Sequence, residues 1–281
     1  MKHDLDVRDL LEHLTIPQPP QMFAAIKAAG DYVEELADVI SNDGAVCSQL
    51  IHTLNTPAFE LRKKIDSVQQ AVEVMGVKAV VNLAKTVLFR QVAENYKVPL
   101  LQACWDASTD VALCSAHLAG LVKTVPPHEA YMLGLFHNCG IPFIMQRYPG
   151  YREILISAYA NESGEISEME ELKIGRSHAD VSFHVAKLWQ LPDSVCSAIE
   201  YHHDIDSEDF HSSMMEDPLA MDHLALLKMS EHLCKLYSHL GKQSADHEWQ
   251  RLEEAVLEYT GISESRFYDL KDDIDSLLAR M

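Results

Sequence analysis

Histidine is the residue type in this sequence whose number and placement could support chemistry. The chain holds 15 histidines, and four of them fall where helices are expected to begin or end, so that side chains from different helices could converge. They are His137 in LFHNCG, His178 in GRSHADV, and the adjacent His202 and His203 in IEYHHD. Imidazole nitrogens are ligands for Zn²⁺, Fe and Ni²⁺. If these side chains converge, they could therefore bind a metal ion.

Each of the four histidines also has a purely structural interpretation. His137 can cap the end of its own helix, where a side chain that can carry positive charge suits the helix dipole. His178 follows a serine with a capping pattern and could simply be exposed to water. His202 and His203 are neighbours, and neighbours on a helix point in different directions. Both could therefore bind one ion only if the helix ends between them.

Motifs that usually mark an enzyme are missing. The sequence contains no GxGxxG, no phosphate-binding P-loop, no GxSxG elbow and no HExxH. The six cysteines are scattered without a CxxC pair, so we expect reduced thiols that are mostly packed. Trp105 and Trp189 lie within apolar helical patterns, which favours a place in the core over a role in binding substrate.

Helix signals recur along the chain, and strand signals are almost absent. Apolar residues at spacings of three and four predict long helices over 77–96 and about 100–122. Capping patterns start helices at Asp31, Ser67 and Ser177. The remaining predicted helices include 4–14 at the start of the chain and, at its end, segments near 218–240, 246–259 and 263–280, after an acidic loop over 204–217.

The short linkers between these helices predict an all-α helical bundle. Val98-Pro99 interrupts the pattern and is the best internal boundary. We therefore expect two lobes, an N-terminal helical lobe over residues 1–98 and a second helical lobe over residues 99–281.

Composition and charge exclude several classes of protein. The hydrophobic content of 47% is normal for a globular chain. No apolar run approaches the roughly 20 residues that span a bilayer, and the acidic N-terminal pattern does not match a signal peptide. We expect a cytoplasmic protein without membrane insertion. The net charge of −20 disfavours nucleic acid as a partner, and residues 200–281 alone hold 19 acids against 7 bases.

Two stretches of the sequence carry a family resemblance. The first contains ELADVISNDGAVCSQLIHTLNTPAF and IDSVQQAVEVMGVKAVVNLA. The second contains CWDASTDVA, YMLGLFHNCGIPFI and GRSHADVSFHVAKLWQLPDSVCSAIEYHH. In this order they resemble the HDOD (HD-related output domain) family, from about Leu14 to about His203. The resemblance implies that the second lobe is HD-domain-like and related to the HD-domain metal-dependent phosphohydrolases.

The related phosphohydrolases bind metal through a first histidine, a His-Asp doublet and a distal aspartate, and some add further histidines for a second ion. In this sequence the first position is Ala107, and the doublet reads His137-Asn138. A neutral amide bridges two cations poorly compared with a carboxylate. The resemblance therefore implies a degenerate metal site.

Other positions of the pattern are retained. His178 and the pair His202-His203 match the additional histidines, and Glu231 in MSEHLC is the nearest match to the distal aspartate. With His137, these residues could still hold one divalent ion such as Zn²⁺, Fe or Ni²⁺ if they converge.

The resemblance implies a bacterial signal-transduction regulator, a non-catalytic HDOD module that acts through contacts with signalling proteins. The alternative is a metal-dependent phosphohydrolase acting on a nucleotide or phosphate ester. Ala107 and Asn138 argue against hydrolysis, because a metal-bound water becomes a nucleophile only on an ion held in a defined geometry. A third possibility is a sensor that binds a nucleotide without cleaving it. Its phosphate contacts could come from the bases Arg147, Lys173 and Arg176.

Overall fold

The computed structural model of the chain describes residue 14 and residues 16–95, 101–122, 124–206, 209 and 217–279. Every regular element in these ranges is a helix and none is a strand, which confirms the predicted all-α fold. None of the helices in the same ranges is long and apolar enough to cross a membrane.

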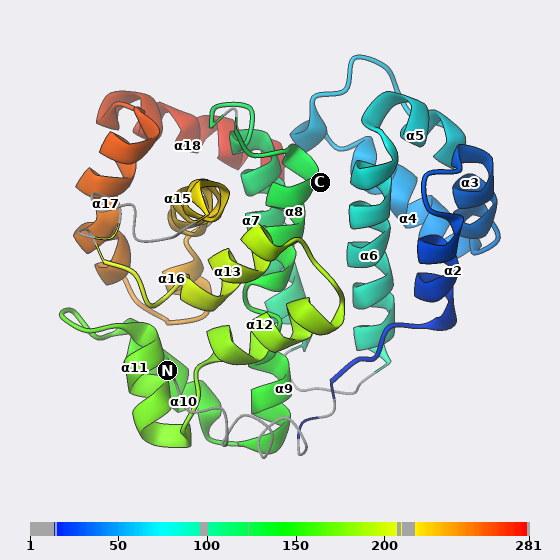
Figure 1. Ribbon diagram of the computed structural model, residues 1–281. Helices are drawn as coiled ribbons and strands as arrows, with labels where there is room; N and C mark the ends of the chain where they lie inside the picture. Colours follow the sequence, from blue (N-terminus) through cyan, green and yellow to red (C-terminus); the bar gives the residue numbers. More distant parts are fainter. Residues whose placement is uncertain are drawn as a thin grey trace.

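The first helices of the chain form one group, drawn in blue to cyan on the right of Figure 1. In chain order they are α2 (Gln21–Ala29), α3 (Val33–Ser41), α4 (Gly44–Leu54), the 3₁₀ helix η1 (Pro57–Phe59), α5 (Val68–Met75) and α6 (Val77–Glu94). The long helix α6 faces the rest of the molecule (Figure 1).

The remaining helices surround the candidate site. They are α7 (Leu101–Leu118), α8 (Pro127–Phe136), α9 (Gly140–Arg147), α10 (Tyr151–Tyr159), α11 (Ile166–Ile174), α12 (His178–Leu188), α13 (Asp193–Tyr201), α15 (Pro218–Leu233), α16 (Leu236–His239), α17 (His247–Thr260) and α18 (Glu264–Leu278). The helices α7 and α8 pack closely, because Gly134 has no side chain: a Cβ there would lie 2.5 Å from the Cα of Ala112.

Several predicted helix starts are correct, and one is wrong. The Ser67 Oγ accepts a hydrogen bond from the Gln70 backbone N–H at 3.1 Å. Ser177 and Asp180 form a complete capping box at the start of α12. The predicted cap at Asp31 is wrong: α3 begins after Tyr32, whose side chain makes no capping hydrogen bond.

Helix ends differ from the prediction where the backbone turns. The predicted helix 218–240 is divided into α15 and α16, because Lys235 adopts a left-handed conformation with φ of 53°. The predicted helix over 100–122 ends at Leu118, shortly before Gly120.

The boundary at Val98-Pro99 and the helix predicted over 4–14 lie outside the described residues, apart from Leu14. The predicted acidic loop is described only at 204–206, 209 and 217. The division into 1–98 and 99–281 stays a prediction.

One continuous apolar core joins the first group of helices to the second. Phe89 of α6 stacks on Phe136 of α8, with ring centroids 4.4 Å apart. Trp189, between α12 and α13, is fully buried against Phe89 and Phe23, at centroid distances of 5.2 and 5.8 Å. Its Nε1–H donates to the carbonyl of Pro17 at 2.8 Å. The predicted core positions of Trp105 and Trp189 are therefore correct.

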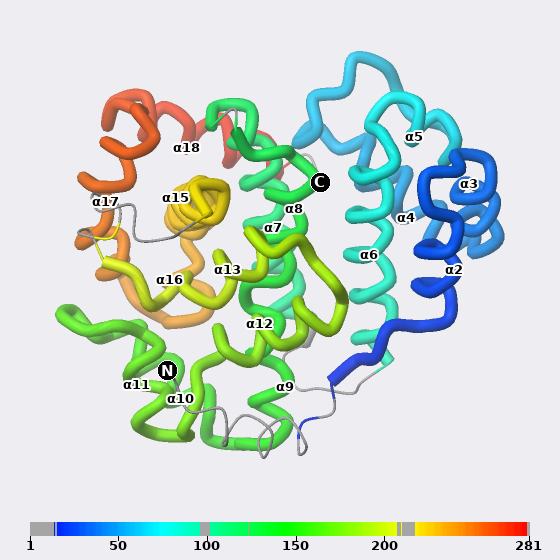
Figure 2. The backbone as a smooth tube through the Cα atoms, viewed as in Figure 1, coloured from blue at the N-terminus to red at the C-terminus, as the bar shows by residue number. Residues whose placement is uncertain are grey.

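The helices α12 and α13 form a hairpin whose turn reaches the first helix group (Figure 2). Lys85 of α6 donates to the carbonyl of Gln190 at 2.6 Å, and Lys27 of α2 donates to its side chain at 2.7 Å. At the other end of the hairpin, His178 begins α12, and His202 follows α13. The hairpin therefore connects the first helix group to the histidines.

We predict that Trp189→Ala lowers the free energy of unfolding by about 3–5 kcal/mol, because it removes a large side chain from the seam between the two helix groups. Urea denaturation followed by circular dichroism measures this change. Tyr32→Ala is the control, since its side chain is 70% exposed and its replacement should cost less than about 0.5 kcal/mol. Equal effects of the two substitutions would contradict the buried position of Trp189.

Candidate functional site

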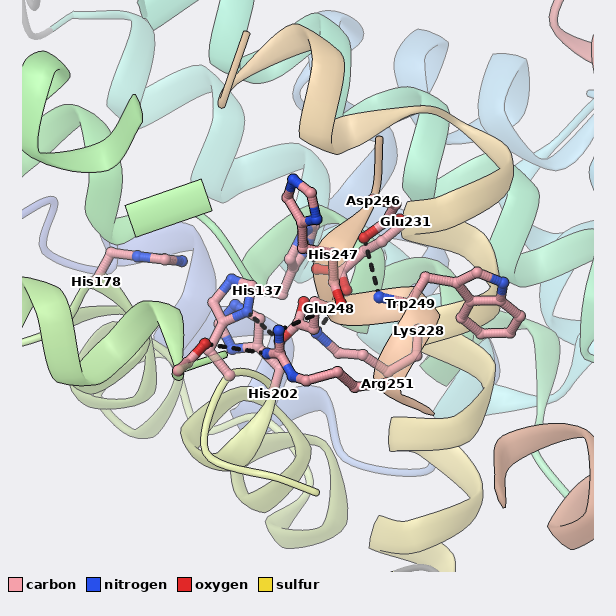
Figure 3. A network of polar contacts seen from close by, with 12 residues as sticks. His137, His178, His202, Lys228, Glu231, Asp246, His247, Glu248, Trp249 and Arg251 are labelled. Carbon is pink, nitrogen blue, oxygen red and sulfur yellow. Dashed lines mark hydrogen bonds and ion pairs between the residues drawn. The ribbon is translucent and has the colours of Figure 1, made fainter. Parts of the chain in front are cut away.

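Four histidines meet in the interior of the second helix group. His137, His178, His202 and His203 are each at most 1% exposed. The ring centroids of His202 and His203 are 4.1 Å apart. The ring centroid of His178 lies 5.3 Å from that of His202 and 4.9 Å from that of His203. His137 is 5.4 Å from His202. We call these four side chains the histidine cluster; Figure 3 labels His137, His178 and His202 among the polar residues around them.

Helix ends place these histidines. His137 follows the last residue of α8, and His178 is the first residue of α12. The helix α13 ends at Tyr201, before the pair, so both His202 and His203 can turn toward His178. From the sequence, joint binding by the pair required a helix end between His202 and His203; the structure instead ends α13 one residue earlier, before both of them. Exposure of His178 to water, the structural interpretation of this residue, is wrong.

In each of the four rings, Nδ1 lies within hydrogen-bond distance of an oxygen acceptor. These contacts are His137 with the Gly134 carbonyl at 2.8 Å, His202 with the Ile199 carbonyl at 2.6 Å, His203 with Glu248 at 2.8 Å, and His178 with Glu170 at 2.8 Å. A carbonyl or carboxylate at Nδ1 requires a proton on that nitrogen and leaves the Nε2 lone pair free. The anchors therefore fix both the orientation and the tautomer of the rings.

Within the histidine cluster, three of the four Nε2 atoms have no hydrogen-bond partner. They belong to His178, His202 and His203, and one ligand atom from each lies within 4.8 Å of the others. Metal-binding histidines commonly have their second nitrogen hydrogen-bonded to a carboxylate or backbone carbonyl, as these do. The buried triad His178, His202 and His203 could therefore bind a metal ion.

His137 differs from the triad. Its Nε2 lies 2.8 Å from the Asn138 side-chain nitrogen, which can donate to it, and 3.3 Å from an oxygen of Glu231. The structure thus brings together all five residues predicted as ligands. It also separates the triad, whose Nε2 atoms are bare, from His137 and Glu231, which face each other.

Lys228 is an unpredicted cation in this interior. Its Nζ lies 2.7 Å from Glu231 and 3.0 Å from Glu248, and its side chain is 2% exposed. Glu248 also accepts from His203, so one carboxylate links the lysine to the triad. Lys228 is three residues before Glu231 on α15, a spacing that the sequence alone could have drawn attention to.

Two further buried residues hold His178 in place. The carboxylate of Glu170 is fully buried and accepts from both the backbone N–H and the Nδ1 of His178. Tyr151 donates its hydroxyl proton to the same carboxylate. Burial, with the charge of Glu170, raises the pKa of Tyr151 well above its usual value. No motif in the sequence pointed to Glu170, Tyr151 or Glu248.

Burial disfavours the charged form of three of these histidines. It lowers the pKa of His137 to about 3, and lowers the pKa values of His202 and His203 well below the usual 6.5. Burial also lowers the pKa of Lys228, but the charges of Glu231 and Glu248 outweigh this effect and raise it. Burial raises the pKa of Glu231, against the opposing charge of Lys228.

The space beside the cluster is small. A cavity lined by His203, Lys228, Glu231 and Glu248, among others, has a volume of about 10 Å³, which is room for about one water molecule. None of the bases suggested for phosphate binding (Arg147, Lys173 and Arg176) lines this cavity. Ala107, at the position of the missing histidine, is half-buried on α7, and its methyl group offers no ligand atom.

Comparisons with known proteins agree with this architecture. A family model described as the HDOD domain matches residues 16–205. A Treponema pallidum (strain Nichols) protein named only as uncharacterized is 24% identical over 198 residues, which cover 68% of this chain. That match spans only 38% of the Treponema protein's length.

Solved structures share the fold over nearly the whole chain. An HDOD domain protein of unknown function from Geobacter sulfurreducens gives a TM-score of 0.69 at 22% identity, covering 97% of this chain and 94% of its own. A Shewanella amazonensis SB2B protein whose name includes the word phosphohydrolase gives 0.66 at 17%, covering 99% and 96%. A Marinobacter aquaeolei VT8 protein whose name includes signal transduction gives 0.61 at 19%, covering 98% and 60%.

We predict that the metal-free protein loses stability as pH falls below about 6.5. The unfolded chain binds protons on His137, His202 and His203 near the usual pKa of about 6.5, whereas the folded chain resists them. Each group then removes up to about 1.4 kcal/mol per pH unit from the free energy of unfolding.

Urea denaturation in the presence of a chelator, measured across pH 5–7.5, checks this slope. His202→Gln should reduce the slope by up to about one proton, and His52→Gln, at an exposed position, should leave it unchanged. A slope that is the same in all three proteins would mean that the cluster is accessible to protons in the folded state.

Proposed function

The chain belongs to the HDOD domain family, and we propose that within it this protein is a non-catalytic regulator of bacterial signal transduction. In this proposal the former HD metal site is a structural centre, and the protein acts through contacts with signalling proteins. Residues 1–98 and 99–281 are its two lobes. The signal-transduction name of the Marinobacter structure agrees with this assignment but belongs to that protein.

The observation that carries the proposal is the contact between Asn138 and His137. A histidine binds a metal through an sp² lone pair, and the Nε2 lone pair of His137 faces the Asn138 amide at 2.8 Å. An aspartate in place of Asn138 would offer a carboxylate to the same region. The amide instead satisfies His137 within the protein, without an ion.

The immediate surroundings also argue against hydrolysis. Lys228 neutralises the carboxylates of Glu231 and Glu248, which are therefore not free to bind cations. The adjoining cavity of about 10 Å³ has no room for a phosphate ester, since pockets for small molecules are typically about 300–1,000 Å³. A substrate could enter only after these side chains moved apart.

We further propose that the triad His178, His202 and His203 holds one divalent ion, Zn²⁺, Fe or Ni²⁺. The Nε2 atoms are bare and their rings are anchored, which suits all three metals. His137 and Glu231, the other predicted ligands, border this triad. When bound, the ion would tie the start of α12 to the end of α13 and so close the open end of the hairpin.

A partner surface of acidic character is the second part of the proposal. An open groove of about 550 Å³ along α17 and its turn into α18 is lined by Glu253, Glu254, Glu258 and Glu264 around Leu257 and Ile262. This mixture of carboxylates and apolar side chains suits a basic segment of a partner protein, with charge accelerating the encounter. Nucleic acid is disfavoured for the same electrostatic reason.

The competing function is a metal-dependent phosphohydrolase acting on a nucleotide or phosphate ester. The observation that favours it is the triad itself, because three anchored imidazoles can leave open positions on an ion for water and substrate. It requires a rearrangement of Lys228, Glu231 and Glu248 that would enlarge the cavity.

We predict no turnover above background on phosphomonoesters, cyclic dinucleotides or nucleoside triphosphates with Mg²⁺, Mn²⁺, Fe²⁺ or Ni²⁺. The double variant Ala107→His, Asn138→Asp should bind divalent ions at least about tenfold more tightly than the natural chain, because it adds one imidazole and one carboxylate. A phosphoesterase panel and titration calorimetry make the two measurements. Metal-dependent hydrolysis by the natural chain that His178→Ala abolishes would overturn the non-catalytic assignment.

We predict that a partner captured from bacterial lysate is released as salt rises, because the attraction between surface charges is screened over roughly 8 Å at physiological salt. The triple variant Glu254→Gln, Glu258→Gln, Glu264→Gln should capture less of it. Neutralising Asp31, Glu34 and Glu35, on and next to α3, is the matched control and should change nothing. Capture that withstands both high salt and the triple substitution would show that the groove is not the contact surface.

A further inference from the structure

Lys228 is the one buried ammonium group that contacts the candidate site among the residues that the structure describes. Its contacts are two carboxylates from different helices, Glu231 of α15 and Glu248 of α17. A lysine is rarely buried to this extent without a partner for its charge. Both partners here belong to the immediate surroundings of the triad, so the positive charge is held beside the place where an ion would bind.

Each oxygen of the two carboxylates beside Lys228 faces either the lysine or a histidine. Glu248 uses one oxygen for His203 and the other for Lys228. Glu231 uses one oxygen for Lys228, and its other oxygen faces His137 without a hydrogen-bond partner. Without the lysine, two buried carboxylates would therefore lose their cation. A metal ion could replace it in part, because both sources supply positive charge to the same interior.

The ammonium and an ion in the triad also repel each other. Lys228 and His203 share the carboxylate of Glu248, and both line the same cavity of about 10 Å³. Two cations this close in an interior with so little water repel each other, because little solvent screens their charges.

We propose that Lys228 is a built-in cation that determines how tightly this centre binds metal. It neutralises Glu231 and Glu248 in the absence of an ion, so the interior folds without metal, and it holds down the affinity of the triad for divalent cations. The proposal rests on the metal-binding part of the proposed function. In this proposal Lys228 sets the affinity of the site for metal without itself binding the ion.

The test is Lys228→Met, which keeps most of the side-chain volume and removes the charge. Titration calorimetry of chelator-treated protein with ZnCl₂ should show at least about tenfold tighter binding than in the natural chain, because one repelling unit charge at close range is gone. Lys228→Arg keeps the charge and should not bind more tightly. Lys235→Met, at an exposed lysine after the same helix, is the matched control and should bind like the natural chain.

Thermal unfolding gives a second readout. Metal-free Lys228→Met should melt below the natural chain, and Zn²⁺ should raise its melting temperature by more than it raises that of the natural chain. If Lys228→Met does not fold without metal, two other proteins are compared in its place. The first is the single variant Glu248→Gln, and the second is the double variant that combines Lys228→Met with Glu248→Gln. The second of these should bind Zn²⁺ at least about tenfold more tightly than the first, for the same reason.

The outcomes distinguish a failure of the role of Lys228 from a failure of the metal site. Equal Zn²⁺ affinity with and without Lys228 overturns the role of the lysine and leaves the metal site standing. Tighter binding in the variant supports the inference, including the case in which the natural chain binds no detectable ion. If no protein in the series binds Zn²⁺, the metal-binding part of the proposed function fails, and the role of Lys228 fails with it.

Discussion

The arrangement depends on the burial of four imidazole rings that must stay uncharged or find a partner in a water-free interior. A buried polar atom without a hydrogen bond costs free energy, and each ring meets this cost at Nδ1 with a carbonyl or carboxylate. His137 is also contacted at Nε2 by Asn138. The three remaining Nε2 atoms carry the unmet cost, and they are the reason to consider a metal ion at this centre.

The same constraint explains why the centre draws on so many helices. The anchors of His178 and His203 are Glu170 on α11 and Glu248 on α17, far apart in sequence. Lys228 on α15 then balances the negative charge that Glu248 brings. The α12–α13 hairpin carries the triad at one end, and at the other end Trp189 is packed in the first helix group. A change at the triad would therefore act on elements that also form the seam between the two groups.

The sequence predicted the helical fold and named the candidate ligands, because apolar spacing, caps and the order of the histidine segments can be read along the chain, but it left open whether those ligands converge. It placed Asn138 and Ala107 as departures from the HD pattern. It did not predict Glu170 or Glu248, since nothing local distinguishes an acid that turns inward from the many that stay exposed. It also left open whether His178 is buried, which follows from the packing of α11 and α12 and not from its neighbours in the chain.

The tautomers of the cluster test the central claim most directly. Long-range proton–nitrogen NMR on metal-free protein at neutral pH distinguishes a proton on Nδ1 from one on Nε2 in each ring. The account predicts that His137, His178, His202 and His203 all carry a proton on Nδ1, with no proton on the Nε2 of the triad. A proton on Nε2 of His178, His202 or His203 would contradict it, because the lone pairs would not then be available to an ion.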